Sequence, residues 1–234
     1  VSSTPVVSVA GHYVTNIDFN NVIGQMKFSP SGNKLAVAHS REQVVQLFDF
    51  NSNTGVISNP ITLYQNPSIT IGNSVYGIEF SPNGEVLYVT KVFEASILQF
   101  DLTASNIPAS MYYVASNYTS DFGSLQLGPD GKIYIAKAFR TELSVISNPN
   151  NLGAACNFQY NGVSLGGKYS MGGLPTFSQS YFYNPSINLS SNCQGEISSF
   201  SLSTNQTVLS TTWNFGDGNT SNLQSPTHSY ANAG

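Results

Sequence analysis

The stretch that decides the fold is FSPSG at residues 28–32, because the chain repeats it. It returns as FSPNG at residues 80–84 and, in a looser form, as LGPDG at residues 127–131. The prolines of the three copies lie 52 and 47 residues apart. Each copy stands between two apolar runs, as a turn between two strands does. The sequence therefore contains three clear copies of one unit of about 50 residues.

Short strands are predicted throughout these units, because apolar and polar residues alternate on both sides of each turn. The predicted strands cover residues 25–28, 34–38, 44–50 and 60–64 in the first unit, 75–80, 86–90, 97–102 and 111–114 in the second, and 123–127, 133–136 and 143–146 in the third. A strand-and-turn repeat of this length is the signature of a β-propeller, in which each four-stranded sheet, or blade, buries its faces against its neighbours. The predicted fold class is therefore all-β.

The propeller is predicted to occupy residues 1–184 and to be partial. Residues 1–24 are predicted to finish a preceding blade, and residues 170–177 to form the first strand of another. Three clear units are fewer than the roughly four to eight blades of a closed ring, and an open array exposes sheet edges. We therefore expect the C-terminal portion of a larger propeller, or a partner that supplies the other blades. The absence of an initial methionine also suggests that a segment precedes Val1.

Composition narrows the class of protein. Hydrophobic residues make up 40% of the chain, enough for packed cores, whereas charged residues make up 9%, well below the roughly 25% of an average domain. Neutral polar residues must cover the surface, which is typical of strand-rich extracellular proteins. A net charge of −4 argues against a nucleic-acid partner, and the sequence has no apolar run of about 18 residues for a transmembrane helix. The predicted location is secreted or on the cell surface.

Two cysteines, Cys156 and Cys193, permit at most one intramolecular disulfide, and their spacing matches no zinc site. An oxidising compartment would allow this bridge. Two buried free thiols are the alternative.

A candidate ligand-binding face is predicted at the ends of the second strands. Aligning the repeats brings His39, Lys91 and Lys137 into equivalent positions, and further charged residues follow directly: Arg41, Glu42, Glu94, Arg140 and Glu142. In propellers the loops after the second strands gather on one face around the axis. These residues are therefore predicted to recognise a polar or anionic ligand such as a glycan. The alternative is that the charges lie in loops because loops are solvated.

No catalytic constellation is predicted. Asp49 and Asp101 could be a carboxylate pair, but they occupy the same repeat position, where an aspartate most simply accepts hydrogen bonds from backbone amides. The sequence has no Gly-x-Ser-x-Gly nucleophile elbow and no His-Glu-x-x-His zinc-binding helix. It also has no phosphate-binding loop and no calcium-binding loop. We therefore predict no catalytic residue, no metal and no cofactor.

The C-terminal segment, residues 185–234, contains WNFGDG at residues 213–218, followed by Pro226, His228, Tyr230 and Gly234. This order resembles the signature of PKD domains, small immunoglobulin-like β-sandwiches of cell-surface proteins, with Asn214 where the family usually has aspartate. The resemblance implies a sandwich that is incomplete in this sequence. The residues expected to be structural are Trp213, Phe215, Asp217 and Tyr230. We expect Asp217 to organise the turn and His228 to lie in a strand; the alternative is a ligand or metal site.

The propeller units, residues 151–158, the GLPTF stretch at residues 173–177 and the PKD signature together resemble a wider family. Its members are secreted, multidomain, gliding-motility-associated proteins with a propeller of the YVTN, kelch or WD40 kind and a sorting domain for the type IX secretion system. The resemblance implies a non-enzymatic protein whose propeller binds a surface glycan or protein, with the PKD domain as a spacer. It also implies the type IX secretion and outer-membrane machinery as a partner.

Two alternatives stay open. The first is a propeller enzyme of the lactonase or glycan-lyase type, because propellers also host active sites along their axis. Clustered acids or histidines on the inner strands would favour it, and the sequence indicates none. The second is a structural subunit or cargo of a surface or secretion assembly.

Overall fold

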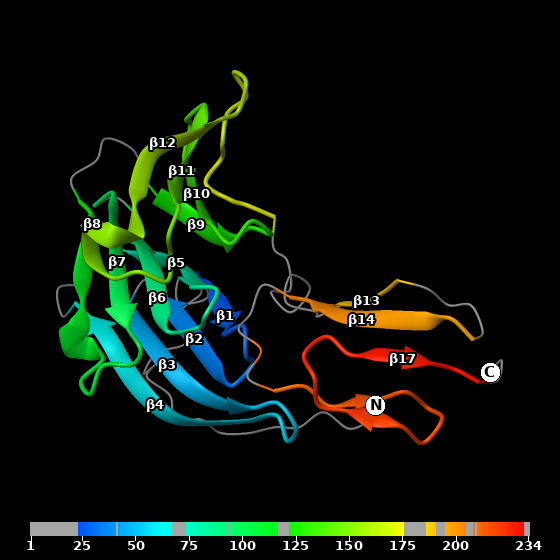
Figure 1. Ribbon diagram of the computed structural model, residues 1–234. Coiled ribbons are helices and arrows are strands. Elements are labelled where there is room, and N and C mark those ends of the chain that lie inside the picture. Colours follow the sequence, from blue (N-terminus) through cyan, green and yellow to red (C-terminus); the bar gives the residue numbers. More distant parts are fainter. Residues whose placement is uncertain are drawn as a thin grey trace. The chain divides into compact units, whose positions relative to one another are not determined.

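The computed structural model describes residues 23–40, 42–66, 74–92, 94–116, 122–175, 186–190, 195–204, 208 and 210–231. The chain divides into two compact units, Val1–Gln179 and Ser180–Gly234, both built of strands (Figure 1). The predicted boundary between residues 184 and 185 lies close to this division.

Within the described residues, the first unit consists of three antiparallel sheets of four strands each. The first sheet contains β1 (Met26–Phe28), β2 (Lys34–His39), β3 (Val44–Asn51) and β4 (Val56–Gln65). The second contains β5 (Val75–Phe80), β6 (Val86–Lys91), β7 (Ser96–Asp101) and β8 (Tyr112–Ala115). The third contains β9 (Phe122–Leu127), β10 (Ile133–Lys137), β11 (Glu142–Ile146) and β12 (Phe158–Ser164). Each sheet keeps its strands in chain order, so the prediction of four-stranded blades is confirmed.

The repeated FSPxG stretch forms the turn between the first two strands of each sheet. Gly32, Gly84 and Gly131 have φ angles of 68°, 74° and 76°, which side chains with a Cβ rarely adopt. Each glycine N–H donates to the carbonyl three residues earlier, at 2.9–3.1 Å. The glycine of the repeat is therefore required by the backbone of the turn.

Neighbouring sheets bury a shared core. One apolar cluster joins Ala36, Ala38 and Leu47 of the first sheet with Ile78 and Phe80 of the second. The inner strand β5 in turn contacts β9 of the third sheet. The first strands of the second and third sheets, β5 and β9, thus pack against the sheet that precedes them in the chain.

Two parts of the first unit differ from the predictions. Strand β12 was not predicted, because its residues are mostly polar and Gly162 interrupts the pattern; its Phe158 and Tyr160 rings both lie 6.0 Å from the Phe122 ring. The strand predicted for residues 170–177 is not formed over residues 171–175. Only a single bridge, between Arg140 and Ser170, is present among the described residues of this segment. Residues 176 and 177 lie outside the described residues. The segment instead lies along β9, whose Ser124 N–H donates to the Gly172 carbonyl at 2.9 Å.

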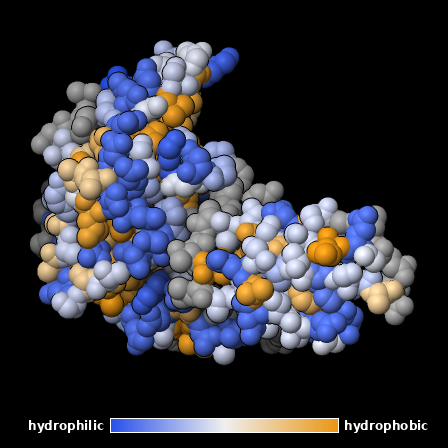
Figure 2. Space-filling view, in the orientation of Figure 1, coloured by the Kyte–Doolittle hydropathy of each residue, from blue (hydrophilic) through white to orange (hydrophobic). Residues whose placement is uncertain are grey.

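The second unit contains β13 (Ser186–Leu189), β14 (Ile197–Ser203) and β17 (Thr227–Ser229) in one sheet, and β15 (Trp213–Asn214) and β16 (Thr220–Ser221) in another. These short strands agree with the β-sandwich that the PKD resemblance implies. The Phe200 ring lies 5.9 Å from the Trp213 ring and 5.2 Å from the Phe215 ring, so Trp213 and Phe215 share one face. Figure 2 shows pale and blue residues over most of the visible face of this unit, consistent with its neutral polar composition.

Candidate functional site

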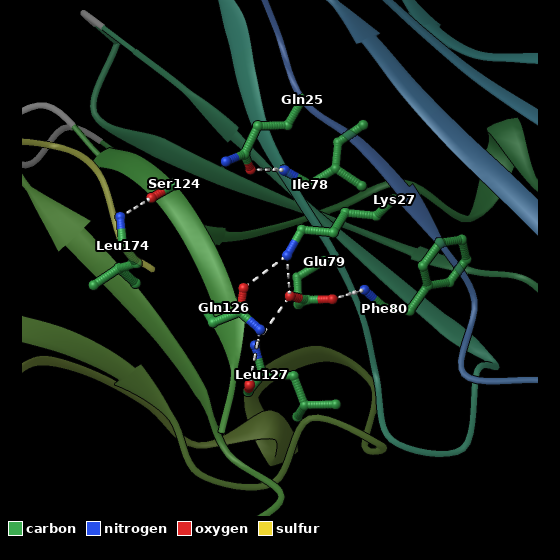
Figure 3. A network of polar contacts seen from close by, with 9 residues as sticks. All are labelled: Gln25, Lys27, Ile78, Glu79, Phe80, Ser124, Gln126, Leu127 and Leu174. Carbon is green, nitrogen blue, oxygen red and sulfur yellow. Dashed lines mark hydrogen bonds and ion pairs between the residues drawn. The ribbon is translucent and has the colours of Figure 1, made fainter. Parts of the chain in front are cut away.

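The inner strands β1, β5 and β9 carry a polar network that joins all three sheets (Figure 3). Lys27 Nζ donates to Glu79 Oε2 at 3.0 Å and to Gln126 Oε1 at 2.9 Å. The backbone N–H of Leu127 donates to the same Glu79 oxygen, and that of Phe80 to the other, both at 3.0 Å. Lys27, Glu79 and Gln126 each stand three residues before the proline of the repeat. The same position of three successive units therefore builds one network.

Burial governs the electrostatics of this network. The Glu79 side chain is fully buried and that of Lys27 is 11% exposed. Burial raises the pKa of Glu79, whereas the Lys27 ammonium and the two backbone donors oppose that rise. The network was not predicted from the sequence, because only clusters of acids or histidines were taken as a sign of a site on the inner strands. The signal that could have found it is the repeat spacing of a lysine, a glutamate and a glutamine.

The structure places three residues of the predicted ligand-binding face at the ends of strands, but it buries the side chains of two of them. His39, Lys91 and Lys137 do end the second strands of their sheets. The side chains of Lys91 and Lys137 are buried, however, with 2% and 0% of the residue exposed. They are not part of an exposed charged rim, because internal partners hold their ammonium groups.

Lys137 shows how such a group is held. Its Nζ donates to the Tyr160 carbonyl at 2.7 Å and to Asn161 Oδ1 at 2.6 Å, and lies 3.8 Å from the centre of the Tyr160 ring. Burial lowers the pKa of Lys137. Lys91 bonds to Glu94 and lies over the Tyr64 ring. Both lysines therefore stabilise the ends of their own strands.

The other predicted rim residues differ in exposure. His39, Glu42, Glu94 and Glu142 are half-buried, and burial lowers the pKa of His39. Arg140 is exposed, and Arg41 lies outside the described residues. Among the predicted cations that the structure describes, Arg140 is thus the exposed one.

Large exposed side chains lie in the two segments that meet at the Arg140–Ser170 bridge. Phe139, Tyr169 and Met171 are 70%, 68% and 70% exposed. Their backbones are paired, because the Phe139 N–H donates to the Ser170 carbonyl and the Ser170 N–H to the Arg140 carbonyl, both at 2.8 Å. We call Phe139, Arg140, Tyr169 and Met171 the β10–β11 patch. Sequence reasoning found only its arginine, because residues 169–171 are distant in sequence from the loop they meet.

Asp49 and Asp101 have structural partners. Asp101 Oδ1 accepts hydrogen bonds from the Thr103 N–H at 2.9 Å and the Thr103 hydroxyl at 2.6 Å, in line with the backbone contact predicted. Asp49 instead accepts from Lys34 Nζ at 2.6 Å and Asn59 Nδ2 at 2.7 Å. These hydrogen bonds lower the pKa of Asp49. Both aspartates hold the ends of their strands.

In the second unit, Asp217 organises the glycine-rich turn, as predicted. Its Oδ1 accepts the Asn219 N–H at 3.0 Å, and its Oδ2 lies 2.7 Å from Nε2 of His228, which lies in β17. The Phe215 ring stacks on the His228 ring at 4.2 Å, and the Tyr230 hydroxyl donates to the Phe215 carbonyl at 3.1 Å. The contacts of Asp217 and His228 are thus internal to the fold.

We expect Asp217→Asn to remove a pH-dependent contribution to the stability of the second unit. The backbone hydrogen bond from Asn219, with the side chains of Asn219 and His228, lowers the pKa of Asp217 from 3.8 to about 2. A carboxylate with a lowered pKa stabilises the fold above pH 3.8, and this contribution is lost as the pH falls toward 2. The difference in Tm between wild type and variant should therefore be largest above pH 4 and should close toward pH 2.

The single tryptophan, Trp213, lies in this unit and supplies a fluorescence readout of its unfolding. Asp130→Asn is the control, because Asp130 also has a lowered pKa but belongs to the first unit. A gap in Tm that stays constant from pH 7 to pH 2 would contradict the role given to Asp217.

Cys156 is buried and is free among the described residues, so the disulfide to Cys193 stays a prediction. Burial raises the pKa of its thiol. Cys193 lies outside the described residues.

The described residues contain no group of three or more side chains arranged to bind a metal ion. Nor does any helix among them have the length and apolar character needed to cross a membrane.

The sheet order and repeated turns define the first unit as an array of β-propeller-type blades. Residues 185–234 match the PKD domain family. The chain is therefore an all-β protein that joins propeller-type sheets to a PKD domain.

Several solved structures resemble the chain. The periplasmic gluconolactonase of Pseudomonas aeruginosa is 12% identical, with a TM-score of 0.44 over 86% of this chain and 56% of that one. A protein from Lactobacillus plantarum is 16% identical, with a TM-score of 0.46 over 63% and 41%. The β-propeller domain of Cps50 (Swd1) from Myceliophteria thermophila is 13% identical, with a TM-score of 0.39 over 70% and 51%. The chain spans about half the length of these structures. A search of curated proteins found no significant match.

Proposed function

We propose that this protein is a non-enzymatic, secreted or cell-surface protein whose propeller-type sheets bind a surface glycan and whose PKD domain is a spacer. The observation that carries the proposal is the β10–β11 patch, whose two paired segments expose two aromatic rings, Met171 and an arginine. Large exposed apolar side chains that gather in one region of the surface mark interaction sites more often than scattered ones do.

The chemistry of the patch fits a sugar. The C–H face of a pyranose ring is apolar and packs on an aromatic ring, as Phe139 and Tyr169 offer. The Arg140 guanidinium can donate to hydroxyl or carboxylate oxygens of the same glycan. The low charge of the chain suits a ligand that is mostly neutral.

The cellular setting of the proposal rests on the resemblance of the whole chain. A PKD domain is typical of extracellular proteins, which supports a secreted or cell-surface location. The resemblance to gliding-motility-associated proteins supports export through the type IX secretion system. Labelling of intact cells with an antibody against the PKD domain would test this location.

A glycan array tests the binding proposal. The wild-type protein should bind one class of surface glycan, and Phe139→Ala with Tyr169→Ala should weaken that binding about tenfold or more, because both rings are removed. The control is Tyr112→Ala with Tyr113→Ala, since both tyrosines are 44% exposed but lie on β8. Equal binding by both variants would contradict the site.

Two other outcomes of the array point elsewhere. If the chain binds a protein rather than a glycan, and this binding also depends on Phe139, the ligand of the patch is a protein. No ligand at all, together with stable assembly into a larger complex, would favour the structural subunit.

The enzymatic alternative has one observation in its favour. Glu79 is a fully buried carboxylate on an inner strand, and burial raises its pKa. Such groups are frequent in active sites. Turnover of a lactone or an acidic glycan by the purified protein would establish this candidate in place of the first.

A further inference from the structure

The exposed positive charge of the first unit lies in the two segments that form the β10–β11 patch. The chain has eight lysines and arginines, and the structure describes all of them except Arg41. Among the described ones, Arg140 and Lys168 are the two that are exposed. Arg140 belongs to the patch, and Lys168 directly precedes its Tyr169. Exposed cations and exposed aromatic rings therefore occur together in this part of the chain.

The other described cations hold groups within the fold. In each of them the ammonium group bonds to an oxygen of the first unit: Lys27, Lys34, Lys91, Lys132 and Lys137. All five are buried or half-buried. The cationic charge that a ligand can reach most easily, among the described residues, is therefore that of Arg140 and Lys168.

A short loop holds Lys168 next to the backbone of Arg140. Two successive glycines with φ angles of 60° and 83° form the tip of this loop, which spans residues 166–169. On one side of the loop, the Leu165 N–H donates to the Thr141 carbonyl at 2.8 Å. On the other side, the Ser170 N–H donates to the Arg140 carbonyl, also at 2.8 Å. Both ends of the loop are thus fixed to two successive residues of the facing segment.

The local charge is positive although the net charge of the chain is −4. Residues 137–142 and 165–171 contain three cations and one acid, Glu142. Glu142 is half-buried and accepts a hydrogen bond from the Thr141 hydroxyl at 2.9 Å, and Lys137 is buried. The exposed charge of these two segments is therefore cationic, which favours a ligand with an anionic group.

We propose that the ligand of the β10–β11 patch is a glycan that contains hexuronic acid, and that Arg140 and Lys168 bind its carboxylate. This inference rests on the proposed function, because it names the class of glycan. The carboxyl carbon of a hexuronic acid is bonded to the pyranose ring itself. A ring that packs on Phe139 or Tyr169 therefore brings its carboxylate close to the cations of the same two segments.

The two cations suit a carboxylate in different ways. The planar guanidinium of Arg140 can donate to both carboxylate oxygens at once, whereas the Lys168 ammonium acts as a point charge. The negative net charge of the chain disfavours a densely charged polymer. Hexuronic acids separated by neutral sugars therefore fit this protein better than an uninterrupted run of acids.

Short oligosaccharides that carry one glucuronic or galacturonic acid test this proposal, with each acid compared with its own methyl ester. The ester keeps the sugar ring and removes the charge. The wild-type protein should bind the acid at least tenfold more tightly than the ester at about 0.1 M salt. This preference should shrink at about 1 M salt, because the screening length falls from about 10 Å to about 3 Å.

Single variants test the two cations. Arg140→Gln and Lys168→Gln should each remove most of the preference for the acid over the ester. Lys132→Gln is the matched control, because Lys132 lies just before β10 in the same sheet, with its side chain 44% exposed and paired with Asp130. This control should keep the preference of the wild type.

The possible failures are distinguishable. Equal affinity for acid and ester would overturn this inference and leave the proposed function in place. Binding of a sulfate ester as tightly as the hexuronic acid would overturn the choice of a carboxylate. Unchanged binding by Phe139→Ala with Tyr169→Ala, or no binding of any oligosaccharide by the wild type, would overturn the proposed function and this inference with it.

Discussion

Replacing Glu79 with alanine is expected to lower the free energy of unfolding of the first unit by about 3 to 5 kcal/mol. The change leaves the Lys27 ammonium, whose side chain is 11% exposed, with Gln126 as its remaining partner in the network. It also removes the acceptor of the Leu127 and Phe80 N–H groups. Uncompensated groups of this kind are among the few causes of very large destabilisation. Urea unfolding followed by circular dichroism measures the loss.

An exposed ion pair in the same unit is the matched control. Lys34 and Asp49 are bonded at 2.6 Å, but their side chains are 37% and 41% exposed. Solvent screens such a pair, so Asp49→Ala should cost less than about 1 kcal/mol. If Glu79→Ala and Asp49→Ala lower the free energy of unfolding equally, burial of the ion pair does not set the size of the loss.

The double variant Lys27→Met with Glu79→Gln separates charge from shape. It removes both charges and keeps an amide oxygen for the backbone donors, so it should recover most of the stability lost by Glu79→Ala. It should also flatten the pH dependence. A buried acid with a raised pKa binds its proton more tightly when folded, so stability falls as the pH rises from the unfolded pKa of 4.5 to the folded one.

The repeat made most of the fold predictable. One turn motif with its glycine sets the register, and the runs beside it alternate clearly, so β5 was predicted over the residues that form it. Strand β4 begins at Val56, before the prediction at residue 60, because an edge strand tolerates Pro60. Where apolar and polar residues do not alternate, as in β12, the sequence alone does not indicate a strand. There the strand is stabilised by packing against Phe122.

The candidate site was less predictable, because a side chain's exposure depends on neighbours that are distant in sequence. The positions of Lys91 and Lys137 could be aligned from the repeat, but their burial depends on Tyr64 and Tyr160. The β10–β11 patch likewise depends on a pairing between residues 139–140 and 170. Spacing within the repeats therefore predicts where a residue lies in its strand, but not whether its side chain is exposed or which groups it contacts.

Gly123→Ala is expected to destabilise the first unit by about 3 kcal/mol, because it forces a side chain between two backbones. A Cβ at Gly123 would lie 2.0 Å from the Gly172 carbonyl oxygen and 2.7 Å from its carbonyl carbon. The clash would break the hydrogen bond from Ser124 N–H to that oxygen and push residues 170–174 away from β9. The β10–β11 patch includes Met171 of this segment and the adjacent Tyr169, so glycan binding should weaken in the same variant.

Gly173→Ala is the control, because a Cβ there meets no atom within 4 Å and its φ is not positive. Thermal unfolding followed by circular dichroism compares the two variants with wild type. Equal Tm values for both would show that the segment does not pack on β9. A lowered Tm for Gly123→Ala alone, with weakened glycan binding, would tie the patch to the inner edge of the third sheet.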